Sequence, residues 1–189
     1  FGHPVRIQQL VQVAEQYGLP LVEDAAESLG SYVGDRHTGT FGICGTLSFN
    51  GNKVITTGGG GAILFDDDAL ADQAKYLSTT AKRPHKWEFF HDELGYNYRM
   101  PALNAAMGCA QMEKLPGFLE KKRALAERYR EAFADMDGLR FVTEPEGCTS
   151  NYWLNAILLE EAGPFKRDEI LDETNAATIM TRPGWTPLH

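Results

Sequence analysis

The sequence predicts an α/β fold with a mainly parallel sheet, and three observations lead to this class. Apolar residues first repeat at the spacing of a helix, at Ile7, Leu10, Val11 and Ala14. A short apolar segment, residues 19–24, follows and is typical of a buried strand. Further strand-like segments come after it, and a helix that precedes buried strands is characteristic of layered α/β proteins.

The first two helices have recognisable ends. Pro4 suits the first turn of a helix, where its missing N–H costs nothing, and Gly18 is placed to end that helix. Residues 62–65 are predicted to form a short strand. The three aspartates at 66–68 are placed to cap a second helix at residues 69–77.

The middle of the chain is predicted to contain a loop and two more helices. Polar and aromatic residues fill positions 78–91, which we expect to form the loop. The helices are predicted at residues 102–114 and 118–136, because Pro116 and Gly117 between them are strong helix breakers.

The pattern changes toward the C-terminal end. Residues 151–159 are predicted to form a strand, residues 168–175 a helix and residues 178–181 a strand, which indicates the start of a small α+β domain. The predicted domains are therefore residues 1–115, the C-terminal part of a large α/β domain, and residues 116–189, a linking helix with part of the small domain.

Composition narrows the classes of function. The apolar fraction is 43% and the charged fraction 23%, as in ordinary globular proteins, and the net charge of −8 argues against nucleic acid or an anionic membrane as a partner. No apolar run approaches the ~20 residues needed to span a bilayer. The three cysteines are scattered and fit a reducing cytoplasm, and neither they nor the five histidines have metal-ligand spacing, so we expect no metal.

Lys53 is the first candidate for a catalytic residue. An apolar segment ends in hydroxyls and amides, presents this lysine and runs into four glycines at 58–61, while Asp24 ends the predicted strand upstream. Enzymes that use pyridoxal 5′-phosphate (PLP) need such a pair, because the amine forms a Schiff base and the carboxylate keeps the pyridine nitrogen protonated. Taken alone, Lys53 is more simply a solvated loop residue and Asp24 a helix cap.

Four segments in order resemble the DegT/DnrJ/StrS family of PLP-dependent nucleotide-sugar aminotransferases. They are residues 23–30 (EDAAESLG), 37–42 (HTGTFG), 46–61 (TLSFNGNKVITTGGGG) and 94–100 (LGYNYRM). The resemblance runs from residue 1 to 189. It implies PLP-dependent transferase fold type I, with Lys53 as the Schiff-base lysine and Asp24 as the partner of the pyridine nitrogen.

The resemblance also implies further cofactor contacts. Ser48 is expected to bind the cofactor phosphate, and Glu27, where the family often has glutamine, to contact the ring. Asn97 is expected to reach the phosphate in a neighbouring subunit, which implies a homodimer with shared active sites. The simpler alternatives are a strand-end serine, a solvent-facing glutamate and a polar loop asparagine.

Three more residues are candidates for substrate binding. Asn50 is expected to orient the lysine or to contact substrate, although an asparagine beside glycine is more often a turn residue. Arg182 suits a diphosphate, and Trp185 can cover a sugar or base. The Glu-Ser-Leu-Gly sequence that begins at Glu27 resembles the branch acting on UDP-linked 4-keto-6-deoxy-N-acetylhexosamines.

The resemblance implies transfer of an amino group, with glutamate as the expected donor, to the C4 keto group of a nucleotide-linked deoxysugar, for amino-sugar and surface-polysaccharide synthesis. A sugar-dehydratase branch carries histidine in place of the lysine, so Lys53 argues against it. A non-catalytic member of the fold is the other alternative. The chain starts at Phe1 rather than methionine, and we expect about half of a family chain to be absent. The longer enzyme is therefore expected to be active, and this chain alone to bind PLP poorly.

Overall fold

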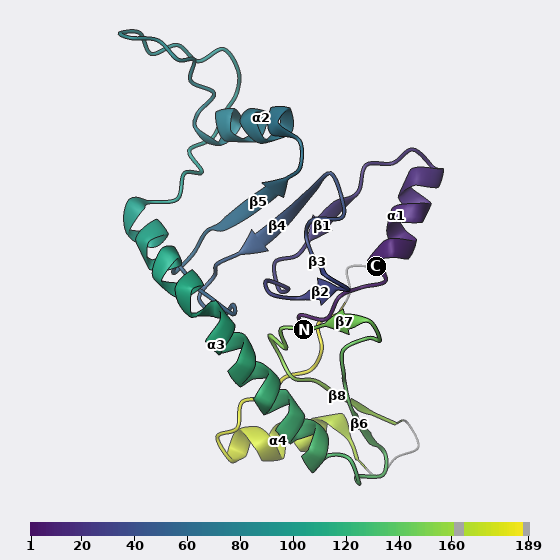
Figure 1. The fold of residues 1–189 in the computed structure, drawn as a ribbon. Helices are drawn as coiled ribbons and strands as arrows, with labels where there is room; N and C mark the ends of the chain where they lie inside the picture. Colours follow the sequence, from purple (N-terminus) through teal and green to yellow (C-terminus); the bar gives the residue numbers. More distant parts are fainter. Residues whose placement is uncertain (161–164, 187–189) are drawn as a thin grey trace. The chain divides into compact units, whose positions relative to one another are not determined.

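The computed structural model describes residues 1–160 and 165–186 (Figure 1). Its elements, in chain order, are α1 (Ile7–Gln16), β1 (Val22–Asp24), β2 (Tyr32–Val33), β3 (Arg36–His37), β4 (Cys44–Ser48), β5 (Gly61–Phe65), α2 (Asp68–Ser78), α3 (Ala102–Ala132), β6 (Leu139–Phe141), β7 (Cys148–Thr149), β8 (Ile157–Leu159) and α4 (Arg167–Ala176).

The described chain forms two compact units. The first contains Phe1–Arg123 and Glu144–Leu154, and the second contains Ala124–Thr143 and the described part of Asn155–His189. The change from one unit to the other therefore falls within α3, and residues 144–154 return to the first unit. The domain boundary between residues 115 and 116 stays a prediction.

A three-stranded sheet in the order β1-β4-β5 is the centre of the first unit (Figure 1). The α/β class is confirmed, but only β1 and β4 are parallel, whereas β4 and β5 pair antiparallel. The expectation of a mainly parallel sheet was therefore wrong for β5. Residues 49–60 join β4 to β5 without a helix, and a parallel neighbour would need a longer crossover.

Local signals predicted the first two helices correctly. α1 occupies the segment with helical apolar spacing and ends just before Gly18, whose φ of 61° is left-handed. The N-cap of α2 is Asp67, whose side chain accepts a hydrogen bond from the Leu70 N–H at 2.9 Å. The predicted loop that follows contains only isolated bridges, between Thr79 and Asn97 and between Lys82 and His91.

α3 corrects the prediction of two helices separated at Pro116. It runs unbroken through Pro116 for 31 residues, although proline removes one helical hydrogen bond. Packing on both sides of the proline offsets this loss. Leu115 is buried, and a Cβ on Gly30 would lie 2.7 Å from the Leu119 side chain, so α3 packs directly on the backbone at Gly30.

The second unit contains β6 paired antiparallel with β8, and α4. The helix predicted at 168–175 is confirmed. The strand predicted at 151–159 is present only at β8, because Tyr152 has a φ of 45° and the segment before β8 bonds to side chains instead of a strand. The strand predicted at 178–181 was also wrong, since Thr178 has a φ of 63° and the next N–H caps α4.

Candidate active site

The parallel pair of strands brings two predicted site residues to one edge of the sheet. Asp24 is the last residue of β1 and Ser48 the last residue of β4, and Asp24 is in register with Thr46. The carboxyl ends of parallel strands share an edge, which is where active sites of open α/β sheets are built. Lys53 follows Ser48 in the loop between β4 and β5.

Helix α3 and the glycine run fix the loop that carries Lys53. Asn104 of α3 donates to the Thr57 carbonyl at 2.5 Å, and Gln111 of α3 accepts from the Thr56 N–H at 3.2 Å. Gly58 and Gly60 have φ of 81° and 96°, a left-handed conformation that glycine adopts without steric cost.

The amine of Lys53 is held between an anion and an aromatic ring. Its side chain is 11% exposed and forms an ion pair with the carboxylate of Glu27, which is 28% exposed. The Nζ atom also lies 4.5 Å from the centre of the Trp153 ring. The structure therefore rejects a freely solvated Lys53 and a purely solvent-facing Glu27.

Asp24 remains available for a ligand. It is exposed, and its Oδ1 accepts one hydrogen bond, from the Ala26 N–H at 3.1 Å. This bond is a local turn contact of the kind that the simpler interpretation expected. Within the described part of the chain this is its one hydrogen bond, which leaves other lone pairs of the carboxylate for a ring nitrogen.

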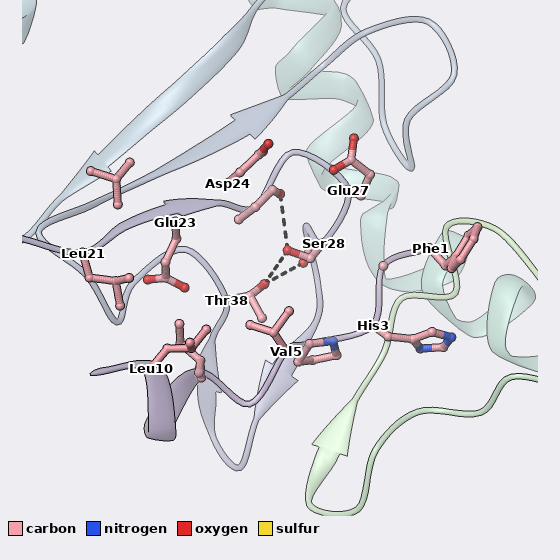
Figure 2. Close-up of a pocket in the computed structure, with 15 residues that line it drawn as sticks. Phe1, His3, Val5, Leu10, Leu21, Glu23, Asp24, Glu27, Ser28 and Thr38 are labelled. Carbon is pink, nitrogen blue, oxygen red and sulfur yellow. Dashed lines mark hydrogen bonds between the residues drawn. The ribbon is translucent and has the colours of Figure 1, made fainter. Parts of the chain in front are cut away.

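Glu23, the neighbour of Asp24, was missed by the sequence reasoning. Strand alternation turns Glu23 to the other face, and Figure 2 shows its carboxylate pointing away from those of Asp24 and Glu27. Glu23 is only 8% exposed and accepts backbone N–H bonds from Gly39 and Gly42, both at 2.8 Å, and from Phe41. It holds the turn at 39–42 against β1.

The glycine at position 45 shows how tightly this turn is packed. A Cβ on Gly45 would lie 2.0 Å from the carbonyl oxygen of Gly39, so only glycine fits in β4 at this point. The turn and the two parallel strands therefore form one closely packed support for Asp24 and Ser48.

The other predicted residues have local contacts. The Ser48 hydroxyl accepts from the Asn50 N–H at 3.3 Å, and the Asn50 amide donates to Asn52 at 3.4 Å. Asn97 is exposed and accepts from the Arg99 side chain at 3.2 Å. Their predicted roles toward a phosphate, a substrate or a second subunit stay predictions.

Asp24 and Glu27 also line a cavity of about 320 Å³ in the first unit (Figure 2). Its other walls come from the N-terminal segment, including His3 and Val5, and from Ser28 and Thr38. The Thr38 hydroxyl donates to Ser28 at 2.8 Å, which closes one side. Lys53 and Ser48 do not line this cavity, so it lies beside the candidate site.

Comparison with known proteins decides the family. The profile of the DegT/DnrJ/EryC1/StrS aminotransferase family matches residues 1–189. The chain belongs to this family. PLP is the cofactor of the family, and a solved structural neighbour, the E. coli GDP-4-keto-6-deoxy-D-mannose-3-dehydratase, contains bound hydrated PLP.

Several curated relatives match the whole chain. A putative pyridoxal phosphate-dependent aminotransferase, EpsN of Bacillus subtilis, is 40% identical over 190 residues, and a GDP-perosamine synthase of Escherichia coli O157:H7 is 35% identical over 189. A UDP-4-amino-4,6-dideoxy-N-acetyl-β-L-altrosamine transaminase of Campylobacter jejuni is 33% identical. The chain spans 48%, 50% and 50% of their lengths, about half of each relative.

Solved structures confirm the fold. The aminotransferase TlmJ of Streptoalloteichus hindustanus superposes with a TM-score of 0.87 at 31% identity, over 93% of this chain and 47% of that one. The E. coli dehydratase superposes with a TM-score of 0.88 at 25% identity, over 96% of this chain and 50% of that one.

The donor set at the sheet edge fits PLP. This chain supplies an amine in Lys53, a carboxylate in Asp24 and a hydroxyl in Ser48. Asp24 and Ser48 end strands β1 and β4, and Lys53 lies in the loop after β4. In general, an amine can bond an aldehyde carbon, a carboxylate can pair with a protonated pyridine nitrogen and a hydroxyl can bind a phosphate, so this donor set is compatible with PLP. No membrane-crossing helix, which would need greater length and apolarity, occurs among the described residues.

Arg182 and Trp185 lie in the second unit. Both are exposed, and the Arg182 guanidinium carbon lies 5.3 Å from the centre of the Trp185 ring. This contact is a cation–π pair. That the pair binds the nucleotide sugar stays a prediction.

Proposed function

We propose that the protein transfers an amino group from glutamate to the C4 keto group of a nucleotide-linked deoxysugar. The single observation that supports this most strongly is the environment of Lys53. Its amine lies between the Glu27 carboxylate and the Trp153 ring, in a loop that follows a sheet edge with the exposed carboxylate of Asp24. A lysine that served only solubility would not need such an arrangement.

The chain's own residues would divide the work as follows. PLP, when bound, supplies a ring that accepts electrons from the carbon whose bond is broken. Lys53 would hold the cofactor covalently and then, as a free amine, move a proton at the reacting carbon. Asp24 would keep the pyridine nitrogen protonated by charge pairing, and Ser48 would hold the phosphate.

Glu27 and Lys53 would act together in proton transfer. The carboxylate of Glu27 contacts the Lys53 amine, so it would lie within reach of the proton that the amine moves. A carboxylate can act as a base in proton transfer, whereas the glutamine that the family often has at this position cannot, because an amide does not take up a proton at neutral pH.

The substrate class is proposed from the relatives and the predicted contacts. The relatives' names include products linked to GDP and to UDP, so the comparisons support a nucleotide sugar without selecting the nucleotide. We propose a UDP-linked 4-keto-6-deoxy-N-acetylhexosamine, on the Glu-Ser-Leu-Gly sequence that starts at Glu27. Arg182 would bind the diphosphate, Trp185 would cover the sugar or base, and Asn50 would contact the substrate.

Assembly and location complete the proposal. We propose a homodimer in which Asn97 of each subunit reaches the phosphate of the neighbouring site. The three cysteines are free in the structure, which fits the reducing cytoplasm where we place the reaction. The amino sugar would be used for surface polysaccharide.

The test is transfer of labelled nitrogen. A protein of full family length that contains these residues would be incubated with PLP, ¹⁵N-glutamate and either the UDP-linked or the GDP-linked 4-keto sugar. We expect ¹⁵N in the UDP-sugar product, none with Lys53→Ala, and unchanged transfer with Lys86→Ala, whose lysine is exposed.

Each other result would reject a stated part of the proposal. Transfer only to the GDP sugar would reject the nucleotide, and loss of water from the sugar without nitrogen transfer would favour the dehydratase alternative. Binding of PLP without any turnover of either sugar would favour a non-catalytic member of the fold.

A further inference from the structure

We infer that Trp153 is a positioning residue for the amine of Lys53, and that the contacts of the segment Ser150–Trp153 hold the tryptophan in position. This inference deepens the proposed function, on which the catalytic role of Lys53 rests. The contacts themselves are independent of any cofactor. The segment is far from Lys53 in the sequence, but both belong to the first unit.

Trp153 contacts both Lys53 and its neighbour Asn52. Its ring is 4.5 Å from Nζ, and its indole Nε1–H donates to the carbonyl of Asn52 at 2.7 Å, one residue before the lysine. The tryptophan is only 4% exposed, so its own position is fixed by packing. One side chain therefore fixes both the backbone beside Lys53 and the direction of its amine.

The same segment fixes the ion-pair partner of the lysine. Asn151 is fully buried, and its amide nitrogen donates to the carbonyls of Glu27 at 2.8 Å and Leu29 at 2.9 Å. Its amide oxygen accepts from the Trp153 N–H at 2.8 Å. Asn151 thus joins the turn that carries Glu27 to the tryptophan that supports Lys53.

Charged contacts anchor both ends of the segment. Arg123 forms a bidentate ion pair with Glu144 at 2.7 and 2.8 Å and also donates to the Ser150 carbonyl at 2.8 Å. Lys122 donates to the Trp153 carbonyl at 3.1 Å. Both cations belong to α3, so the helix that supports the lysine loop also supports Trp153.

These contacts suit an amine that must be released from a covalent bond and then form that bond again. When Lys53 is released from a covalent bond, the ring and Glu27 together offer the ammonium a defined site close to where it must act. A tryptophan that only filled the core would still need a partner for its N–H, but it would not need its ring beside the Lys53 amine.

The test compares the reactivity of the Lys53 amine in Trp153→Leu and Trp153→Phe. Acetic anhydride would label the lysines, and mass spectrometry would give the rate at Lys53 relative to Lys86 in the same molecule. We expect labelling about tenfold faster in Trp153→Leu, which loses the aromatic ring and the donor, and about threefold faster in Trp153→Phe, which keeps a smaller aromatic ring but loses the donor.

Trp87→Leu is the matched control. Trp87 is exposed, and its ring lies 4.7 Å from the Lys86 amine, so it is the same kind of pair without the buried anchors. For this variant the Lys53 rate would be normalised to Lys121 instead, and we expect it unchanged. Circular dichroism would check folding, and if Trp153→Leu does not fold, Trp153→Phe decides.

Equal Lys53 labelling in the folded Trp153 variants and the wild type would overturn the inference. In a protein of full family length, the rate at which borohydride traps PLP on Lys53 would connect the position of the amine to function, and we expect the Trp153→Phe rate to be about threefold below wild type. Absence of any trapped PLP in the wild-type protein of that length would reject the proposed function and leave the labelling comparison valid.

Discussion

Replacing Glu23 with glutamine would remove one charge and one hydrogen-bond acceptor from the support of the sheet edge. The carboxylate accepts from the N–H groups of Gly39, Phe41 and Gly42, with Oε1 shared by the last two. Glutamine has almost the same shape but a single acceptor oxygen. Because two oxygens serve three donors now, at least one donor would face an NH₂ group.

The structure allows the loss to be estimated. The best arrangement of the glutamine keeps its oxygen at Phe41 and Gly42 and turns its NH₂ toward the Gly39 N–H. Losing one hydrogen bond to a charged group costs about 1.5–3 kcal/mol, and the buried donor left unpaired adds to it. We expect the free energy of unfolding to fall by about 2–4 kcal/mol.

Urea unfolding measures this change directly. With a slope of about 2 kcal/mol/M, the midpoint should fall by about 1–2 M without a change in slope. The matched control is Asp24→Asn, one residue along the strand. Asp24 is exposed, so we expect its stability effect to stay within about 0.5 kcal/mol, while amino transfer is lost. A Glu23→Gln protein as stable as the wild type would show that the three backbone N–H groups do not depend on the Glu23 carboxylate.

Three further changes test the packing and the charges. Gly45→Ala should lower the free energy of unfolding by about 2 kcal/mol or more in urea, because its Cβ would meet a backbone oxygen, whereas Gly51→Ala, with nothing within 4 Å, should change it by less than about 0.5. Burial lowers the pKa of His37, and its ring accepts a backbone N–H, so stability should fall as pH drops below the ordinary histidine value of about 6.5. The folded chain binds that proton less readily than the unfolded chain, and His37→Gln should remove this part of the pH dependence in urea titrations from pH 7 to 5. Arg123→Met should cost about 1–2 kcal/mol at pH 7, because the hydrogen bonds from Arg123 hold the pKa of Glu144 below its usual range, and thermal melts should show the difference shrinking as Glu144 is protonated at low pH.

Elements with local signals were predicted well from the sequence. α1 and α2 follow from apolar spacing, Gly18 and the Asp67 cap, and all of these signals lie within or next to the helix. The positive φ of Gly58 and Gly60 follows from the glycine run itself. The candidate roles of the site residues came from the match to family motifs, because the apolar periodicity of a sequence indicates helices and strands but not which residues act in a reaction.

Elements set by distant contacts were not predictable in this way. α3 continues through Pro116 because its neighbours pack on Gly30, which is far away in the sequence. Glu23 looked like one more polar residue in a motif, and its role needs a turn 16 to 19 residues later. No signal near Trp153 pointed to Lys53, since the contact joins residues 100 positions apart.

The most direct test of the central claim is where PLP attaches. Incubation of a protein of full family length with PLP, reduction with borohydride and mapping by mass spectrometry would locate the covalent adduct. We expect one modified lysine, Lys53, with the adduct lost in Lys53→Ala and retained in Lys86→Ala. Modification spread over exposed lysines, or unchanged in Lys53→Ala, would show that Lys53 is not the attachment site.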